Sequence, residues 1–163
     1  MRGYTLIELL LTLVLLGILS VAAMGLFANK NSFSVTVVAD QVMSQLNLTQ
    51  QVALGRHSFN AAGVPVDTRF NISSSGGELD LSVTQGNYQS ASRVNADSVT
   101  VSWKTSATTH CGSATAVTSS DLTVNFNHAG ETNNNVLICL AGQRLIPICI
   151  TRLGLVYEGF CES

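Results

Sequence analysis

Residues 2–10 read RGYTLIELL, and this stretch decides the fold of the 163-residue chain. After Glu8 no charged residue follows until Lys30, so residues 9–29 form an apolar run that is long enough to span a bilayer as a helix. An acid at the edge of such a run is costly in an apolar environment unless it finds a partner. Glu8 is therefore the first candidate functional residue.

The position of the small residue distinguishes this stretch from an ordinary secretory signal, in which cleavage follows the apolar run. Here Gly3 comes before the run, and the sequence GYTLIE at residues 3–8 resembles the prepilin signal of type IV pilins and type II secretion pseudopilins. The resemblance implies cleavage between Gly3 and Tyr4 by the prepilin peptidase, N-methylation of Tyr4, and retention of the apolar helix. Tyr4 replaces the usual phenylalanine. The alternative is a plain signal anchor in which Glu8 is incidental.

The same resemblance implies an α+β pilin fold. In that fold a long N-terminal helix, transmembrane in its first half and amphipathic in its second half, packs on an antiparallel β-sheet head. The divisions expected here are a leader at 1–3, a transmembrane and assembly half at 4–29, an amphipathic half at 30–55, and a β-rich head with disulfides at 56–163.

The residue pattern also predicts the second half of the helix. Apolar residues recur at spacings of three, four and seven, which is typical of an amphipathic helix, and Gly55 offers a C-terminal stop. A continuous helix from Tyr4 to Leu54 would reach about 75 Å at 1.5 Å per residue. Gly25 occupies the place where family members often carry proline, so we expect a straighter helix, or one that bends near Gly17 or Gly25 only inside a filament. The apolar positions are Val35, Val38, Val42, Leu46 and Ala53.

After Gly55 the apolar period changes to two, which predicts antiparallel strands with one face on the helix. These strands are centred on 70–72, 79–83, 99–103 and 122–126. Three further runs predict a closing meander with a turn near Gly142, and Pro147 should mark a sheet edge or a strand start. Polar stretches predict surface loops. The meander runs are 136–140, 146–150 and 153–157, and the predicted loops are 60–65, 85–95 and 106–120.

Charge argues against nucleic acid as a partner. The net charge is -2, and only 11% of the residues are charged, so no basic surface is evident. Residues 125–130 and 148–156 resemble the C-terminal half of GspH/FimT-like minor pilins, some of which bind DNA through a basic tail after the final glycine. In this chain Gly154 is followed by Leu155 and, three residues later, by Glu158, so the basic tail is absent.

Four cysteines in the second half of the chain predict disulfides outside the cytoplasm. They allow three pairings, and the sequence alone does not choose among them. We favour Cys111 with Cys139 and Cys149 with Cys161, because the second pair would close the C-terminal loop as pilins often do. A zinc site at His110 and Cys111 lacks the paired spacing of zinc ligands, so we expect no metal and no cofactor.

The histidines His57, His110 and His128 are scattered, and no catalytic motif occurs, so we predict that the protein is not an enzyme. The predicted function is that of a structural, minor subunit of a type IV pilus or type II secretion pseudopilus. Its expected partners are other pilin or pseudopilin subunits, the prepilin peptidase, the inner-membrane assembly platform and membrane lipid. In the assembled filament, Glu8 would pair with the Tyr4 amine of a neighbouring subunit.

The expected location is the inner membrane of a Gram-negative bacterium. The N-terminus would be cytoplasmic and the head periplasmic before assembly. The alternative function is that of a surface adhesin or DNA-uptake minor pilin, in which the loops at 85–95 and 106–120 bind a ligand.

Overall fold

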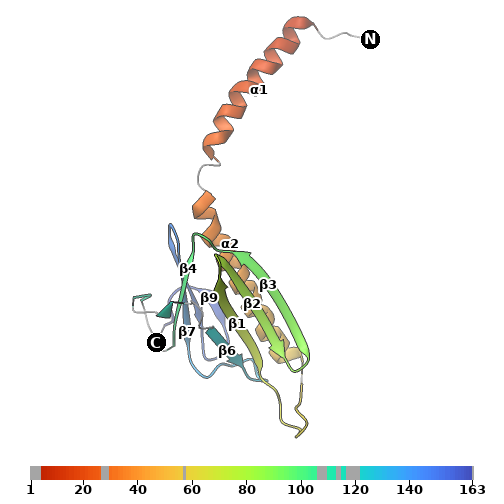
Figure 1. The fold of residues 1–163 in the computed structure, drawn as a ribbon, viewed down its shortest axis with the longest axis vertical. Coiled ribbons are helices and arrows are strands. Elements are labelled where there is room, and N and C mark those ends of the chain that lie inside the picture. Colours follow the sequence, from red (N-terminus) through yellow and green to blue (C-terminus); the bar gives the residue numbers. More distant parts are fainter. Residues whose placement is uncertain are drawn as a thin grey trace. The chain divides into compact units, whose positions relative to one another are not determined.

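The apolar run at the start of the chain folds as helix α1, Leu6–Leu26, in the computed structural model (Figure 1). The structure describes residues 5–26, 30–56, 58–105, 110–112, 115–116 and 122–162, without the side chains of 21–33 and 115–116. By its contacts the chain forms two compact units, Met1–Lys30 and Asn31–Ser163.

The helix expected from Tyr4 to Leu54 is described as two helices, α1 and α2, and the second spans Lys30–Gly55. Residues 27–29, where the two would join, lie outside the described residues. Helix α1 is not interrupted at Gly17 or Gly25. Helix α2 ends at Gly55, so the predicted stop is confirmed.

Helix α2 buries the apolar face that its spacing predicts. All five predicted positions, from Val35 to Ala53, are buried, while Asp40 and Gln51 between them are exposed. Thr49 also lies on the buried face, and its hydroxyl donates to the carbonyl oxygen of Gln45 at 2.6 Å. Because this hydrogen bond satisfies the hydroxyl, the apolar face tolerates one polar residue.

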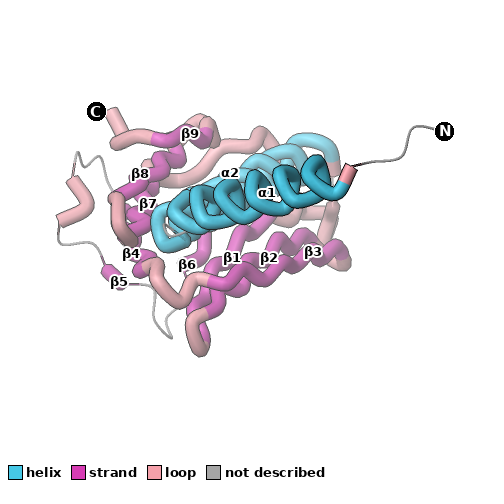
Figure 2. Tube along the Cα trace, turned by 90° about the horizontal axis from the view of Figure 1, so that it is seen from above, coloured by secondary structure: helices cyan, strands magenta, loops and turns pink. Residues whose placement is uncertain are grey.

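The head contains two antiparallel sheets. The first has the strand order β3-β2-β1-β6 and the second the order β5-β4-β7-β8-β9. Figure 2 shows the strands of both sheets arranged around α2. The strands of the first sheet are β1 Thr68–Ser75, β2 Glu78–Gln85, β3 Tyr88–Asn95 and β6 Leu122–Phe126. Those of the second are β4 Thr100–Thr105, β5 Thr115–Ala116, β7 Val136–Ala141, β8 Leu145–Ile150 and β9 Val156–Glu158.

The inner faces of both sheets and the buried face of α2 form a common core. Alternate residues of β1 and β2 point into it, as the period of two predicted. Burial of this apolar surface is the main favourable term that holds α2 on the sheets. The largest side chains of this core include Phe70, Phe126, Leu46, Ile72, Leu81, Ile138 and Ile148.

Strand β7 is buried on both faces, which explains why its sequence does not alternate. Ile138 and Leu140 point into the main core, whereas Leu137 and Cys139 belong to a second, smaller cluster. Successive side chains of a strand point to opposite faces, so this second cluster lies on the outer face of the sheet.

Two disulfides are the centre of that outer cluster. They join Cys111 to Cys139 and Cys149 to Cys161, which is the pairing favoured in the sequence analysis. The second disulfide fixes the C-terminal segment over β8.

Strand β3 corrects the expectation of a loop at residues 85–95. It pairs with β2 over eight consecutive residue pairs, from Glu78 with Asn95 to Gln85 with Tyr88. Strand β3 is one of the two edge strands of this sheet, and its inward-facing residues before Val94 are only half-buried and include Ser90 and Ser92, so its sequence lacks apolar alternation.

Two expectations about the closing meander were also wrong. The strand expected at 153–157 begins only at Val156, because residues 151–155 form a turn in which Gly154 has φ +79° and donates to the carbonyl of Thr151 at 2.8 Å. Pro147 lies within β8, an interior strand. The carbonyl oxygen of Pro147 accepts a hydrogen bond from the amide of Gly159, one residue past the end of β9. The nitrogen of Pro147 faces the same side as its carbonyl, so the missing N–H faces a place where the neighbouring strand has ended. Most of the loop expected at 106–120 lies outside the described residues.

Candidate functional site

The candidate site begins at the first turn of α1, where Glu8 is exposed. The Glu8 amide donates to the carbonyl oxygen of Thr5 at 3.0 Å. Thr5 and Glu8 have the spacing of a helix capping box, and an acid in a first turn is favoured by the helix dipole. Part of the role of Glu8 can therefore be to stabilise its own helix. Sequence reasoning missed Thr5, although the Thr-x-x-Glu spacing was visible.

The carboxylate of Glu8 makes no ion pair within the described part of the chain, where Arg93 forms the ion pairs. The other polar side chains of α1 behave differently. The Thr12 hydroxyl donates to the carbonyl of Leu9 at 2.8 Å, and the Ser20 hydroxyl donates to that of Leu16 at 2.7 Å. Both hydroxyls are thus satisfied inside the helix and need no outside partner.

The rest of the described α1 surface is apolar and exposed. Such a large exposed apolar surface marks a site of association with a protein or a membrane. No helix among the described residues reaches the combined length and apolarity that a membrane span requires. The exposed apolar residues are Leu6, Ile7, Leu9, Leu10, Leu11, Leu13, Val14, Leu15, Leu16, Ile18 and Leu19.

Gly3 and Tyr4, the predicted processing residues, lie outside the described residues. An apolar arm with one acid near its start, followed by a head of one helix and two antiparallel sheets, is the arrangement expected of a pilin-like subunit. The comparison with known proteins supports this class. Residues 1–24 match the family model of the prokaryotic N-terminal methylation motif, which is the prepilin signal of type IV pilins and pseudopilins.

The motif supports a type IV pilin- or pseudopilin-like subunit, and it implies processing by the prepilin peptidase and assembly with other pilins. No curated protein and no solved structure matches the chain. The narrower resemblance to GspH/FimT-like minor pilins therefore stays a prediction.

Among the described residues, the titratable side chains that the sequence singled out in the head are not gathered into a site. His110 and His128 are exposed, and the ring of His110 meets the ring of Phe160 edge-on, with 6.4 Å between centroids. His57 lies outside the described residues. In the part of the chain that the structure describes, no three His, Cys, Asp or Glu residues are placed to hold a metal ion.

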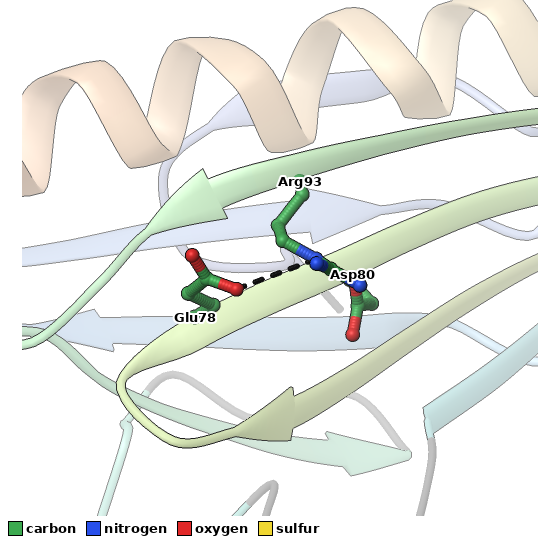
Figure 3. A network of polar contacts seen from close by, with 3 residues as sticks. All are labelled: Glu78, Asp80 and Arg93. Atoms are coloured by element: carbon green, nitrogen blue, oxygen red, sulfur yellow. Dashed lines mark hydrogen bonds and ion pairs between the residues drawn. The ribbon is translucent and has the colours of Figure 1, made fainter.

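A charged cluster on the outer face of the first sheet has a structural explanation. Arg93 of β3 lies 2.7 Å from Asp80 and 3.4 Å from Glu78, both on β2 (Figure 3). The hydrogen bond to Asp80 and the charges of both acids raise the pKa of Arg93. All three side chains are exposed, and cross-strand pairs of this kind are common on solvated sheets.

Proposed function

We propose that the chain is a structural subunit of a type IV pilus or a type II secretion pseudopilus. The observation that carries the proposal is the methylation motif at residues 1–24, which coincides with an exposed apolar helix bearing one acid. In this account the prepilin peptidase cleaves after Gly3 and methylates the new amine of Tyr4. The apolar surface of α1 then packs against the helices of other subunits.

Glu8 sets the register of that packing. A carboxylate surrounded by apolar helices is tolerated only when it is paired, because its desolvation costs several kcal/mol. The amine of Tyr4 on a neighbouring subunit is the proposed partner. Thr12 and Ser20 need no such partner, because their hydroxyls bond to carbonyls of the same helix.

Before assembly, the proposed location is the inner membrane, with a single pass and a periplasmic head. Two observations support it. The sequence carries no charge from Leu9 to Asn29, and the head contains two disulfides, which persist in oxidising compartments.

The finer part of the proposal is that the chain is a minor subunit, present in few copies, that primes or caps assembly. The alternative, an adhesin or DNA-uptake pilin, loses one of its two candidate loops, because residues 88–95 form strand β3. Counting this chain against the major subunit in sheared filaments distinguishes a minor subunit from a bulk one. Filaments made chiefly of this chain would exclude the minor role.

Variants of Glu8 test the mechanism. Glu8→Ala and Glu8→Leu should leave the head folded and the chain in the membrane, but should strongly reduce its amount in filaments. Glu8→Gln separates the two roles of this residue, since glutamine also serves in a capping box but carries no charge. We expect it to fail in assembly as well. Thr12→Ala, one turn further along the same helix, is the matched control and should assemble normally. Normal incorporation of Glu8→Gln would refute the charge pairing.

Gly3→Ala tests the processing step. This change should block cleavage, so that the uncleaved chain accumulates in the membrane and is missing from filaments. Efficient cleavage of the variant, measured by N-terminal mass, would contradict the assigned cleavage site.

A further inference from the structure

The two ends of the head carry exposed surfaces that complement each other. The first, here called the distal surface, lies at the C-terminal end of α2. Leu54, Leu153 and Leu155 keep 51%, 75% and 59% of their surface exposed there. Beside them is an open hollow of about 350 Å³. The distal surface consists of Leu54, Leu155 and the four residues that line the hollow, Glu131, Thr132, Arg152 and Leu153.

Close contacts hold the distal surface together as one patch. Leu54 lies against Gly130, whose carbonyl lies so close to Gly154 that a side chain at that position would overlap it. The amide of Thr132 donates to the carbonyl of Arg152 at 2.9 Å, which ties the two walls of the hollow to each other. The patch is thus formed before any partner arrives, which lowers the entropic cost of binding.

The second surface is the turn between β7 and β8, residues 141–145, here called the proximal tip. All five residues are exposed, and Leu145 keeps 48% of its surface exposed. The guanidinium of Arg144 donates to the hydroxyl of Thr36 at 3.2 Å, so the tip lies beside the first turns of α2 (Figure 1). Thr36 precedes Leu54 by eighteen residues on α2, which is about 27 Å along the axis. The tip and the distal surface are therefore at opposite ends of the same compact unit.

Charge and polarity match between the two ends. The hollow presents Glu131 and Arg152 next to exposed leucines. The tip presents the base Arg144 and the exposed Leu145. The hollow thus offers an acid and exposed leucine to the base and the exposed leucine of the tip, as in interfaces with an apolar centre and a polar rim.

We propose that the proximal tip of one copy docks into the distal surface of a second copy, with Leu145 against Leu153 and Arg144 against Glu131. Two different surfaces on opposite ends form a head-to-tail contact, which leaves free ends and so continues along a line of copies. The inference rests on the proposed function, because the second copy is a neighbouring subunit in the same filament. The contact needs adjacent copies of this chain, so it rests on the role of structural subunit and not on the finer role of a low-copy priming or capping subunit.

A photocrosslinking experiment tests the contact in the full-length chain. Leu145→p-benzoylphenylalanine is made in living cells, and the chain is recovered from both filament and membrane fractions after irradiation. We expect crosslinks to residues 152–155 of another copy. They cannot arise within one copy, because the two ends are too far apart. Gln89→p-benzoylphenylalanine, on the outer face of the first sheet, is the control and should give no such product.

Charge reversal adds a second readout. Arg144→Glu or Glu131→Arg should each lower the yield of the crosslink about three- to fivefold, and the double variant should restore it. Crosslinks to another protein, to another surface, or to nothing in either fraction would overturn the inference. Absence of the chain from filaments, with the crosslink present in membranes, would instead refute the proposed function alone.

Discussion

The same substitution should strongly destabilise the head when it is made in α2 and leave its stability nearly unchanged when it is made in α1. Leu46 in α2 is fully buried, whereas Leu16 in α1 is 60% exposed. Leu46→Ala removes a core side chain and leaves a cavity between α2 and the sheets, which costs about 3–5 kcal/mol. For a chain of this size we expect the melting temperature to fall by about 3 °C per kcal/mol, or about 9–15 °C in total.

Leu16→Ala is the matched control. Alanine keeps the helix, and no core contact of the head is lost, so the melting temperature should change by less than about 2 °C. The assay is thermal unfolding of the full chain in detergent, followed by near-ultraviolet circular dichroism of the aromatic residues in the head. Equal destabilisation by both variants, or an unchanged melting temperature for Leu46→Ala, would refute the assignment of α2 alone to the core of the head.

Three further predictions concern the head and use the same unfolding assay. Replacing Cys149 and Cys161 together by serine opens a loop with a sequence separation of 12 and should cost about 3 kcal/mol; an unchanged melting temperature would contradict this. Gly154→Ala should cost at least about 1 kcal/mol, because its φ is positive and the Gly130 carbonyl blocks a side chain, and a neutral result would argue against this turn. Arg93→Ala should leave stability nearly unchanged, since its ion pairs are exposed; a large loss would show that they are structural.

The sequence predicted the helix and strands that have one face buried in the core and the opposite face exposed. Helical spacing identified the buried face of α2, and alternation identified β1, β2, β4 and β6, because one face of each element meets the core. Strand β3 was missed because an edge strand of Ser, Gln and Asn lacks that signal. The division into two sheets was also not predictable, since it depends on which strands pair across long separations.

The candidate site was predictable where it is local in sequence. Glu8 could be identified because its position relative to Gly3 and the apolar run is written in consecutive residues. The distal surface could not, because Leu54 and Leu153 are 99 residues apart in sequence and come together only in the folded head. A single exposed leucine is also ordinary on a protein surface, so it gives no signal of a contact site.

The central claim is that residues 1–24 carry a signal that is processed before the chain enters a filament. The most direct measurement is the intact mass and N-terminal peptide of this chain, recovered from purified filaments of cells that express it at its natural level. We predict a chain that begins at Tyr4, carries one added methyl group on its amine, and retains both disulfides. A filament-borne chain that still begins at Met1, or a chain found only in the membrane, would contradict the account.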